Sequence, residues 1–261
     1  MPQPTGGFEW TQAPWGTVLR CRPLLDIADH FFTTADVALG PDDPEWKAVA
    51  SGIGVERARL LLIRQVHGAT VAVARATRSP EWDRPEADVI VSDDRTSAIG
   101  VRVADCAPIL LADARLGVAG AAHAGWRGTV HSAAAVAVRA MSDTFGSAPA
   151  DLVAGIGPCL GRCCGEVGLE VVDAFRSGGH REDALGRWFQ PGQSGRSYLD
   201  LALANSDQLV SAGVPPSRIH VAGLCTKCSP SVFHSYRHAK GHAGRMLAAI
   251  RGITSSAAPP S

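Results

Sequence analysis

Residues 118–128 read Val-Ala-Gly-Ala-Ala-His-Ala-Gly-Trp-Arg-Gly: an apolar run, then His123, then two glycines around a Trp-Arg pair. The apolar run predicts a strand over residues 118–122, and the composition beyond it predicts a helix over residues 128–145. Glycines between a strand and a helix let a ligand approach the backbone closely. His123 therefore stands where functional side chains tend to gather.

The sequence on either side predicts further short strands rich in β-branched residues, over residues 59–66, 70–74, 89–92, 98–103, 109–112, 152–156 and 219–222. Three further segments have a helical composition, namely residues 168–176, 199–212 and 241–251. Residues 36–56 look rich in loops. Strands come in groups before helices rather than in alternation. We therefore expect an α+β fold, a single layered α/β/α domain with mixed β-sheets. It should span residues 1–251, followed by a flexible C-terminal tail over residues 252–261.

The chain has 261 residues, of which 46% are hydrophobic and 19% charged, as is typical of a globular protein with a sizeable core. Its 25 basic and 25 acidic residues cancel, so no bulk field favours nucleic acid or an anionic membrane. Residues 1–15 do not resemble a signal peptide, and no apolar run is long enough for a membrane span. Seven cysteines, an odd number, favour reduced thiols. We expect a cytoplasmic protein without nucleic-acid or membrane partners; its oligomeric state stays open.

One potential metal ligand stands at the end of each of three predicted strands: His67, Cys106 and His123. Two imidazoles and one thiolate suit zinc and leave a fourth position open to water or substrate. Asp105, next to the thiol, is expected to orient a ligand histidine. Because these residues lie far apart along the chain, the spacing by itself fits a structural cysteine and two core histidines equally well.

A resemblance to a known family favours the metal site. The three segments are followed by residues 157–168, Gly-Pro-Cys-Leu-Gly-Arg-Cys-Cys-Gly-Glu-Val-Gly, and then by Cys225-Thr226, Ser235-Tyr236-Arg237 and Gly244-Arg245-Met246. Together, over residues 58–250, these motifs resemble the laccase-domain purine nucleoside phosphorylase family (YfiH-like), whose members are also named polyphenol oxidase or peptidoglycan editing factor. The resemblance implies a zinc site made of His67, Cys106 and His123, with copper as the alternative metal. It also implies phosphorolysis of adenosine, inosine, guanosine and methylthioadenosine, with adenosine deamination as a companion activity.

The implied chemistry assigns roles to particular side chains. The candidate catalytic residues are His67, Cys106, His123 and Asp105. Purine nucleosides and phosphate are the expected partners. Guanidinium groups pair bidentately with phosphate oxygens. The candidate substrate-binding residues are therefore Arg127, Arg237 and Arg245, together with Gln65, and Glu166 is a candidate proton shuttle.

The N-terminal part departs from the family pattern. Residues 30–47 lack the glycine pair and the arginines that family members carry in this region. If those arginines hold phosphate in the family, phosphate binds more weakly here or uses Lys47 or Arg57.

Three other functions stay open. A multicopper polyphenol oxidase needs His-x-His pairs, whereas the nine histidines here form none; a single copper remains compatible with phenol oxidation. A Cys–His hydrolase would use Cys106 as the nucleophile and His123 or His67 as the base. The third alternative is a peptidoglycan-editing factor, because some family members are linked to peptidoglycan fidelity.

The remaining cysteines include a CxxC, formed by Cys225 and Cys228, and the adjacent pair Cys163 and Cys164. A zinc ribbon normally contains two CxxC knuckles, and only one is present. We therefore interpret these four cysteines as reduced structural thiols.

Overall fold

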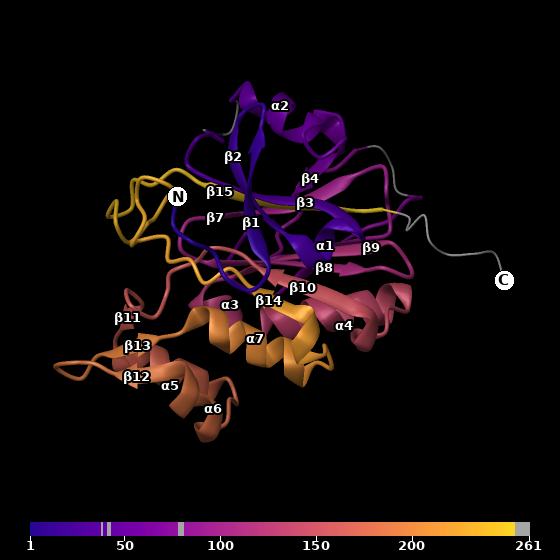
Figure 1. The fold of residues 1–261 in the computed structure, drawn as a ribbon. Coiled ribbons are helices and arrows are strands. Elements are labelled where there is room, and N and C mark those ends of the chain that lie inside the picture. The colour runs from indigo at the N-terminus through magenta and orange to yellow at the C-terminus, as the bar shows by residue number, and fades with distance from the viewer. Residues whose placement is uncertain (38, 41–42, 78–80, 254–261) are drawn as a thin grey trace.

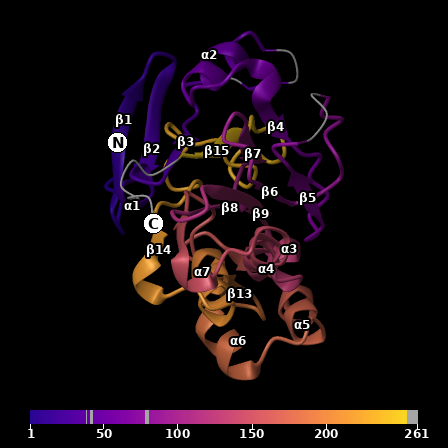
Figure 2. The same cartoon turned by 90° about the vertical axis from the view of Figure 1, so that its right-hand side faces the viewer.

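A computed structural model describes residues 1–37, 39–40, 43–77 and 81–253 of this chain. Two six-stranded β-sheets lie face to face, and helices cover the outer face of each sheet (Figure 1). The view turned by 90° shows α2 (Glu45–Ser51) over the first sheet and most of the other helices beyond the second (Figure 2). The predicted α+β fold with α/β/α layers and mixed β-sheets is confirmed, and its β layer consists of two stacked sheets.

The first sheet combines strands from both ends of the chain. Its order is β1-β2-β3-β15-β7-β4, and every neighbouring pair is antiparallel except β4 and β7. Its strands are β1 (Phe8–Ala13), β2 (Gly16–Cys21), β3 (Ala28–Thr33), β4 (Leu60–Leu62), β7 (Ala98–Val103) and β15 (Met246–Gly252).

The second sheet has the order β14-β10-β8-β9-β6-β5. Its outermost pairs, β10 with β14 and β5 with β6, are parallel, and the others are antiparallel. Its strands are β5 (Val71–Ala74), β6 (Val89–Ser92), β8 (Ala107–Asp113), β9 (Val118–Ala124), β10 (Leu152–Ile156) and β14 (Ile219–Val221). The predicted bounds hold for β6, β7 and β10, and β8 and β9 extend beyond theirs.

Three hydrophobic cores separate these layers. One lies between the sheets and includes Phe32 and Leu110. A second packs the outer face of the first sheet against Trp46 and Val49 of α2. The third packs the second sheet against the remaining large helices. The strands that are buried on both faces read as continuous apolar runs for this reason.

The helices that cover the second sheet begin directly after the stretch that opens the prediction. They are α3 (Trp126–Val130), α4 (Ala133–Phe145), α5 (Leu169–Ser177), α6 (Glu182–Trp188) and α7 (Leu201–Ser211). The predicted helix over residues 128–145 is thus two helices, because Ser132 takes a left-handed conformation with φ 56° between them. A small sheet of β11 (Glu166–Val167), β12 (Phe189–Pro191) and β13 (Ser197–Leu199) packs beside them, and α1 (Arg22–Leu25) joins β2 to β3.

Strand β15 corrects the prediction of a helix over residues 241–251. Met-Leu-Ala-Ala-Ile contains good helix formers, but residues 246–250 are all buried. The strand pairs along both edges, so that Ala248 faces Phe32 on one side and Val101 on the other. Its alternate side chains enter the core between the sheets and the core under α2. Pairing and burial therefore override the local propensity.

Two further expectations concern loops and termini. The stretch over residues 36–56 contains α2 as well as loops, because Trp46, Val49 and Ala50 form a buried face. Gly252 of the predicted tail is the last residue of β15, and residues 254–261 lie outside the described residues. Within the described ranges, no helix is long and apolar enough to cross a membrane.

Candidate functional site

Two connections between the sheets bring the predicted metal ligands together. His67 lies between β4 of the first sheet and β5 of the second, and Cys106 lies between β7 and β8. His123 lies near the end of β9, where it pairs with Pro108, two residues beyond Cys106. The three ligands thus meet at one end of the paired sheets, although they are distant in the sequence.

The donor atoms of His67, Cys106 and His123 all lie within 4.8 Å of one another. The two imidazole rings are 4.9 Å apart between centroids and meet edge to face at 77°. Gly125 leaves the space that this arrangement needs, since a Cβ there would lie 2.8 Å from Cys106 Sγ. The first glycine of the quoted stretch is therefore required by close packing rather than by an unusual backbone angle.

A buried carboxylate, Asp88, holds the two histidines in place. Its Oδ1 accepts from His123 Nδ1 at 2.8 Å and from the His67 backbone N–H at 3.0 Å. Its Oδ2 accepts from the N–H groups of Gly68 at 2.6 Å and Val66 at 3.3 Å. A carboxylate behind a ligand imidazole fixes the ring and its tautomer, which leaves His123 Nε2 for a metal.

The backbone of His67 makes this cradle possible. Its φ of 63° is left-handed, and three successive N–H groups converge on one carboxylate, as in an anion-binding nest. Asp88 was not predicted as a site residue. The available signal is an acidic residue directly before Val89–Ser92, a strand whose residues are all buried; a fully buried aspartate requires a partner.

Asp88, rather than Asp105, is the carboxylate that meets a ligand histidine, which corrects the expected role of Asp105. Asp105 accepts from Thr226 Oγ1 at 2.5 Å and from the Arg237 backbone N–H at 2.6 Å. It has a left-handed φ of 84°, a conformation that Asp tolerates better than most residues. Asp105 thus ties the turn that carries Cys106 to the segment before β15.

The electrostatics of the site favour a thiolate beside charged imidazole. Burial raises the pKa of the Cys106 thiol, but hydrogen bonds and positive charge from His123 and His67 outweigh burial and lower the pKa to about 6. Burial lowers the pKa of His123, but Asp88 and Cys106 outweigh it and raise the pKa to about 9. Burial likewise opposes the charge of Asp88, yet its hydrogen bonds to His123 and the backbone hold its pKa below the usual range.

This donor set fits a divalent metal such as zinc. Zinc bonds of about 2.0–2.3 Å to nitrogen and sulfur require donors separated by about 3.3–3.8 Å, and the three donors lie together within the 4.8 Å limit. The thiol ionises readily, and Asp88 supplies the partner that ligand histidines usually have. The three protein donors leave a fourth tetrahedral position for water or substrate.

The three donors open into a cavity of about 1080 Å³. Every predicted site residue lines it, namely Gln65, His67, Asp105, Cys106, His123, Arg127, Arg237 and Arg245. Three arginines that were not predicted also line the cavity: Arg64, Arg84 and Arg102. Neither Lys47 nor Arg57 is among the lining residues, and Arg57 instead lies over the Trp46 ring at 4.9 Å.

The cavity carries positive charge without matching carboxylates. In the described part of the chain, Arg127, Arg237 and Arg245 form no ion pair. Burial lowers the pKa of Arg102, and the positive charges of Arg84 and Arg245 lower it further. Guanidinium groups that repel one another across a cavity are a favourable setting for a bound anion.

Two of the predicted residues have their polar groups engaged. The Gln65 side chain donates to Arg102 O at 2.7 Å and accepts from the Arg102 N–H at 2.9 Å, so it joins the end of β4 to β7. Glu166 is exposed on β11 and lines a neighbouring cavity with Cys163 and Cys164. The Arg237 guanidinium donates to the Glu166 backbone oxygen at 2.9 Å.

Comparison with known proteins agrees with this architecture. Residues 44–252 match the model of the family described as multi-copper polyphenol oxidoreductase laccase. A purine nucleoside phosphorylase of Deinococcus radiodurans is 36% identical over 258 residues, which cover 91% of this chain and 94% of the relative. Adenosine deaminase RL5, from an unknown prokaryotic organism, is 35% identical over 209 residues, 77% of this chain and 78% of that protein. The crystal structure of YlmD from Geobacillus stearothermophilus superposes with a TM-score of 0.82 at 30% identity, covering 95% of this chain and 99% of that one. This chain therefore belongs to the multi-copper polyphenol oxidoreductase laccase family.

Proposed function

We propose that this protein is a zinc-dependent purine nucleoside phosphorylase that also deaminates adenosine. The observation that carries the proposal is the meeting of a His/Cys/His donor set and unpaired arginines in one cavity of about 1080 Å³. Relatives named purine nucleoside phosphorylase and adenosine deaminase support both activities. Adenosine, inosine, guanosine and methylthioadenosine are the proposed nucleosides, and a cytoplasmic location with reduced cysteines is proposed with them.

His67, Cys106 and His123 would hold the zinc, and Asp88 would keep His123 oriented through Nδ1. Zinc at this position would polarise a substrate oxygen or lower the pKa of a bound water. The role of Asp105 follows from its contacts: it positions the Cys106 turn by bonding Thr226 and the Arg237 N–H. We therefore regard both Asp88 and Asp105 as positioning residues.

Phosphorolysis requires an anion beside the ribose. The bond between C1′ and the purine nitrogen breaks, a phosphate oxygen bonds to C1′, and the purine leaves with the electron pair and takes up a proton. Arg84, Arg102 and Arg245 are the guanidinium groups whose mutual repulsion phosphate would relieve. Arg127 and Arg237 line the same cavity and are the further candidates. This set compensates for the family arginines that residues 30–47 lack.

The purine requires an apolar surface, and Tyr236 offers one. Its side chain is 54% exposed, which is high for an aromatic residue, and it lines the cavity beside Arg237. Trp126 lines the cavity as well, although the Arg127 guanidinium covers its ring at 4.2 Å. Purine bases stack readily on such rings. In the companion reaction, water adds to the ring carbon that bears the amino group and ammonia leaves.

One observation favours a second candidate, a Cys–His hydrolase. The Cys106 thiol, with its pKa lowered to about 6, lies within hydrogen-bonding reach of His123 and His67, as an activated nucleophile would. Metal binding consumes the same thiolate, so the two functions exclude each other at this site. The copper oxidase and the peptidoglycan-editing factor remain alternatives, with no contact in the cavity that favours either.

The decisive experiment measures metal and products together. Zinc is quantified in protein purified without added metal, for the wild type and for Cys106→Ser. Each protein is then incubated with adenosine, with and without phosphate. We expect zinc and activity in the wild type and a large loss of both in Cys106→Ser. Adenine with ribose 1-phosphate reports phosphorolysis, and inosine reports deamination. Turnover by metal-free wild type would refute the zinc mechanism, and no turnover of any purine nucleoside would refute the assignment.

A further inference from the structure

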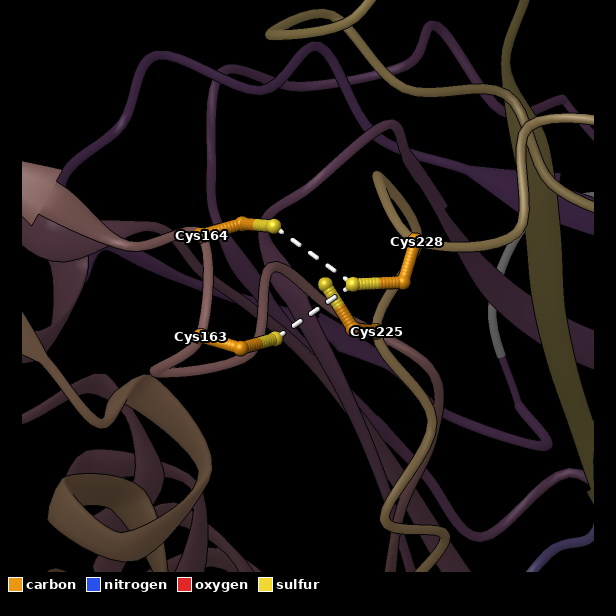
Figure 3. Close-up of side chains that lie close together, drawn as sticks. All are labelled: Cys163, Cys164, Cys225 and Cys228. Atoms are coloured by element: carbon orange, nitrogen blue, oxygen red, sulfur yellow. Dashed lines mark hydrogen bonds between the residues drawn. The ribbon is translucent and has the colours of Figure 1, made fainter.

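Four cysteines outside the catalytic cavity form a second cluster of potential metal ligands. Cys163 and Cys164 follow β10, and Cys225 and Cys228 follow β14. Their four sulfur atoms all lie within 4.8 Å of one another. Cys228 Sγ is 3.5 Å from both Cys163 Sγ and Cys164 Sγ. Figure 3 shows the side chains of the two segments pointing toward one common centre.

The spacing of the sulfurs suits one tetrahedral ion. Four zinc–sulfur bonds of about 2.3 Å place the sulfurs about 3.8 Å apart, close to the 3.5 Å that Cys228 shows to its two neighbours. A disulfide would need about 2.05 Å. A cluster of four irons would need wider spacing, because each cysteine then binds a different iron. Tetrahedral coordination by four sulfurs is typical of zinc or of a single iron.

Backbone contacts hold the two segments together independently of the thiols. Cys159 and Cys225 form a parallel β-bridge, in which the Thr226 N–H donates to Cys159 O at 3.0 Å. The Gly161 N–H donates to Cys225 Sγ at 3.3 Å. A Cβ on Gly161 would lie 3.0 Å from Cys225 Cβ and 3.4 Å from Cys163 Sγ, so glycine permits this approach. The thiols are thus positioned before any ion binds.

We propose that Cys163, Cys164, Cys225 and Cys228 bind one structural Zn²⁺, separate from the His67, Cys106 and His123 site. All four ligands come from the protein, so no position is open to substrate, and the site is structural rather than catalytic. The adjacent pair and the single CxxC replace the two CxxC knuckles of a zinc ribbon. This corrects the interpretation of these cysteines as reduced structural thiols. The inference does not rest on the proposed nucleoside chemistry.

The second ion would connect the segments that support the catalytic cavity. Thr226, next to Cys225, donates to Asp105, which directly precedes Cys106. Arg237 lies on the same connection to β15 and donates to Asp105 and to the Glu166 oxygen. Removing the ion should therefore loosen the Cys106 turn from a distance and lower the melting temperature.

The test counts metal ions in the full chain. Metal-stripped protein, kept reduced, is titrated with Co²⁺ and then with Zn²⁺. We expect two equivalents for the wild type, with an intense sulfur-to-cobalt charge-transfer band from the four-thiolate site. Cys106→Ser should lose one equivalent and keep most of this band, whereas Cys228→Ser should lose one equivalent and most of the band. One equivalent in the wild type, with a band that Cys228→Ser leaves unchanged, would overturn the proposal.

A second measurement on the wild type applies even if Cys228→Ser does not fold. Alkylation followed by mass spectrometry compares the native protein with and without Zn²⁺. The buried thiols of Cys21 and Cys159 serve as internal references. Zn²⁺ should protect Cys163, Cys164, Cys225 and Cys228 together by at least tenfold in rate. Unchanged alkylation, or disulfides among these four in the protein as purified under reducing conditions, would refute the site.

Discussion

Replacing Asp88 with asparagine tests whether the carboxylate organises the metal site. The substitution keeps the size of the side chain and removes its charge. In the structure four donors point at this carboxylate: the N–H groups of residues 66–68 and His123 Nδ1. An asparagine oxygen can replace only one of the two carboxylate oxygens.

The magnitude follows from which donors lose their acceptor. With its NH₂ group in place of Oδ2, the asparagine faces the Gly68 N–H across 2.6 Å and abandons Val66 as well. With the amide flipped, the His67 N–H and His123 Nδ1 lose their partner. Either way two buried donors are unsatisfied, at about 1–3 kcal/mol each, so the free energy of unfolding should fall by about 2–6 kcal/mol. Loss of the carboxylate behind a ligand histidine should weaken zinc binding about 10- to 100-fold.

Asp113→Asn is a matched control. Asp113 is also buried, at the opposite end of β8 from Cys106, and its Oδ1 accepts the N–H groups of Arg115 and Leu116. Zinc affinity is measured by competition with a chromogenic chelator, and stability by urea unfolding of the metal-free protein. Asp113→Asn should bind zinc like the wild type. An Asp88→Asn protein with wild-type zinc affinity would refute the idea that this carboxylate orients the ligands.

Three further predictions test the packing, the anion pocket and the pH dependence. Gly125→Ala should displace the thiol of Cys106, to which the new Cβ would come within 2.8 Å, and reduce zinc binding at least tenfold by the same competition assay. Gly186→Ala, where a Cβ meets nothing within 4 Å, should leave zinc binding unchanged. Arg245→Met should raise the KM for phosphate about tenfold or more and spare adenosine deamination, because the loss of one guanidinium affects only the anion; equal losses in both reactions would contradict this. Burial lowers the pKa of His30 to about 4 from 6.5, so its contribution to stability is complete above pH 6.5 and disappears as the pH falls through 4. Urea unfolding should show about 3 kcal/mol more loss between pH 7 and pH 4 in the wild type than in His30→Gln, and parallel curves would contradict the assignment.

Much of the second sheet was predictable because its strands are buried on both faces. The runs over residues 89–92 and 152–156 are short, β-branched and bounded by turns, and they form β6 and β10 with the predicted bounds. The three metal ligands were predictable only through their motifs, since each stands alone at the end of a strand. The resemblance of those motifs to one family also predicted the family to which the match of residues 44–252 assigns the chain.

Other features depend on which segments meet in space. Residues 246–250 favour a helix by composition, but they form the strand between β3 and β7 because those two strands offer free edges on both sides. Asp88 acquires its role through a left-handed turn at His67, which is 21 residues away. Cys163 and Cys228 are 65 residues apart, and only the β-bridge between their segments unites the two pairs. The amino-acid pattern by itself determined which segments are apolar, β-branched or glycine-bounded, because those properties act within a few residues. The tertiary structure decided which donors, carboxylates and thiols share a site, because that depends on contacts between segments distant in sequence.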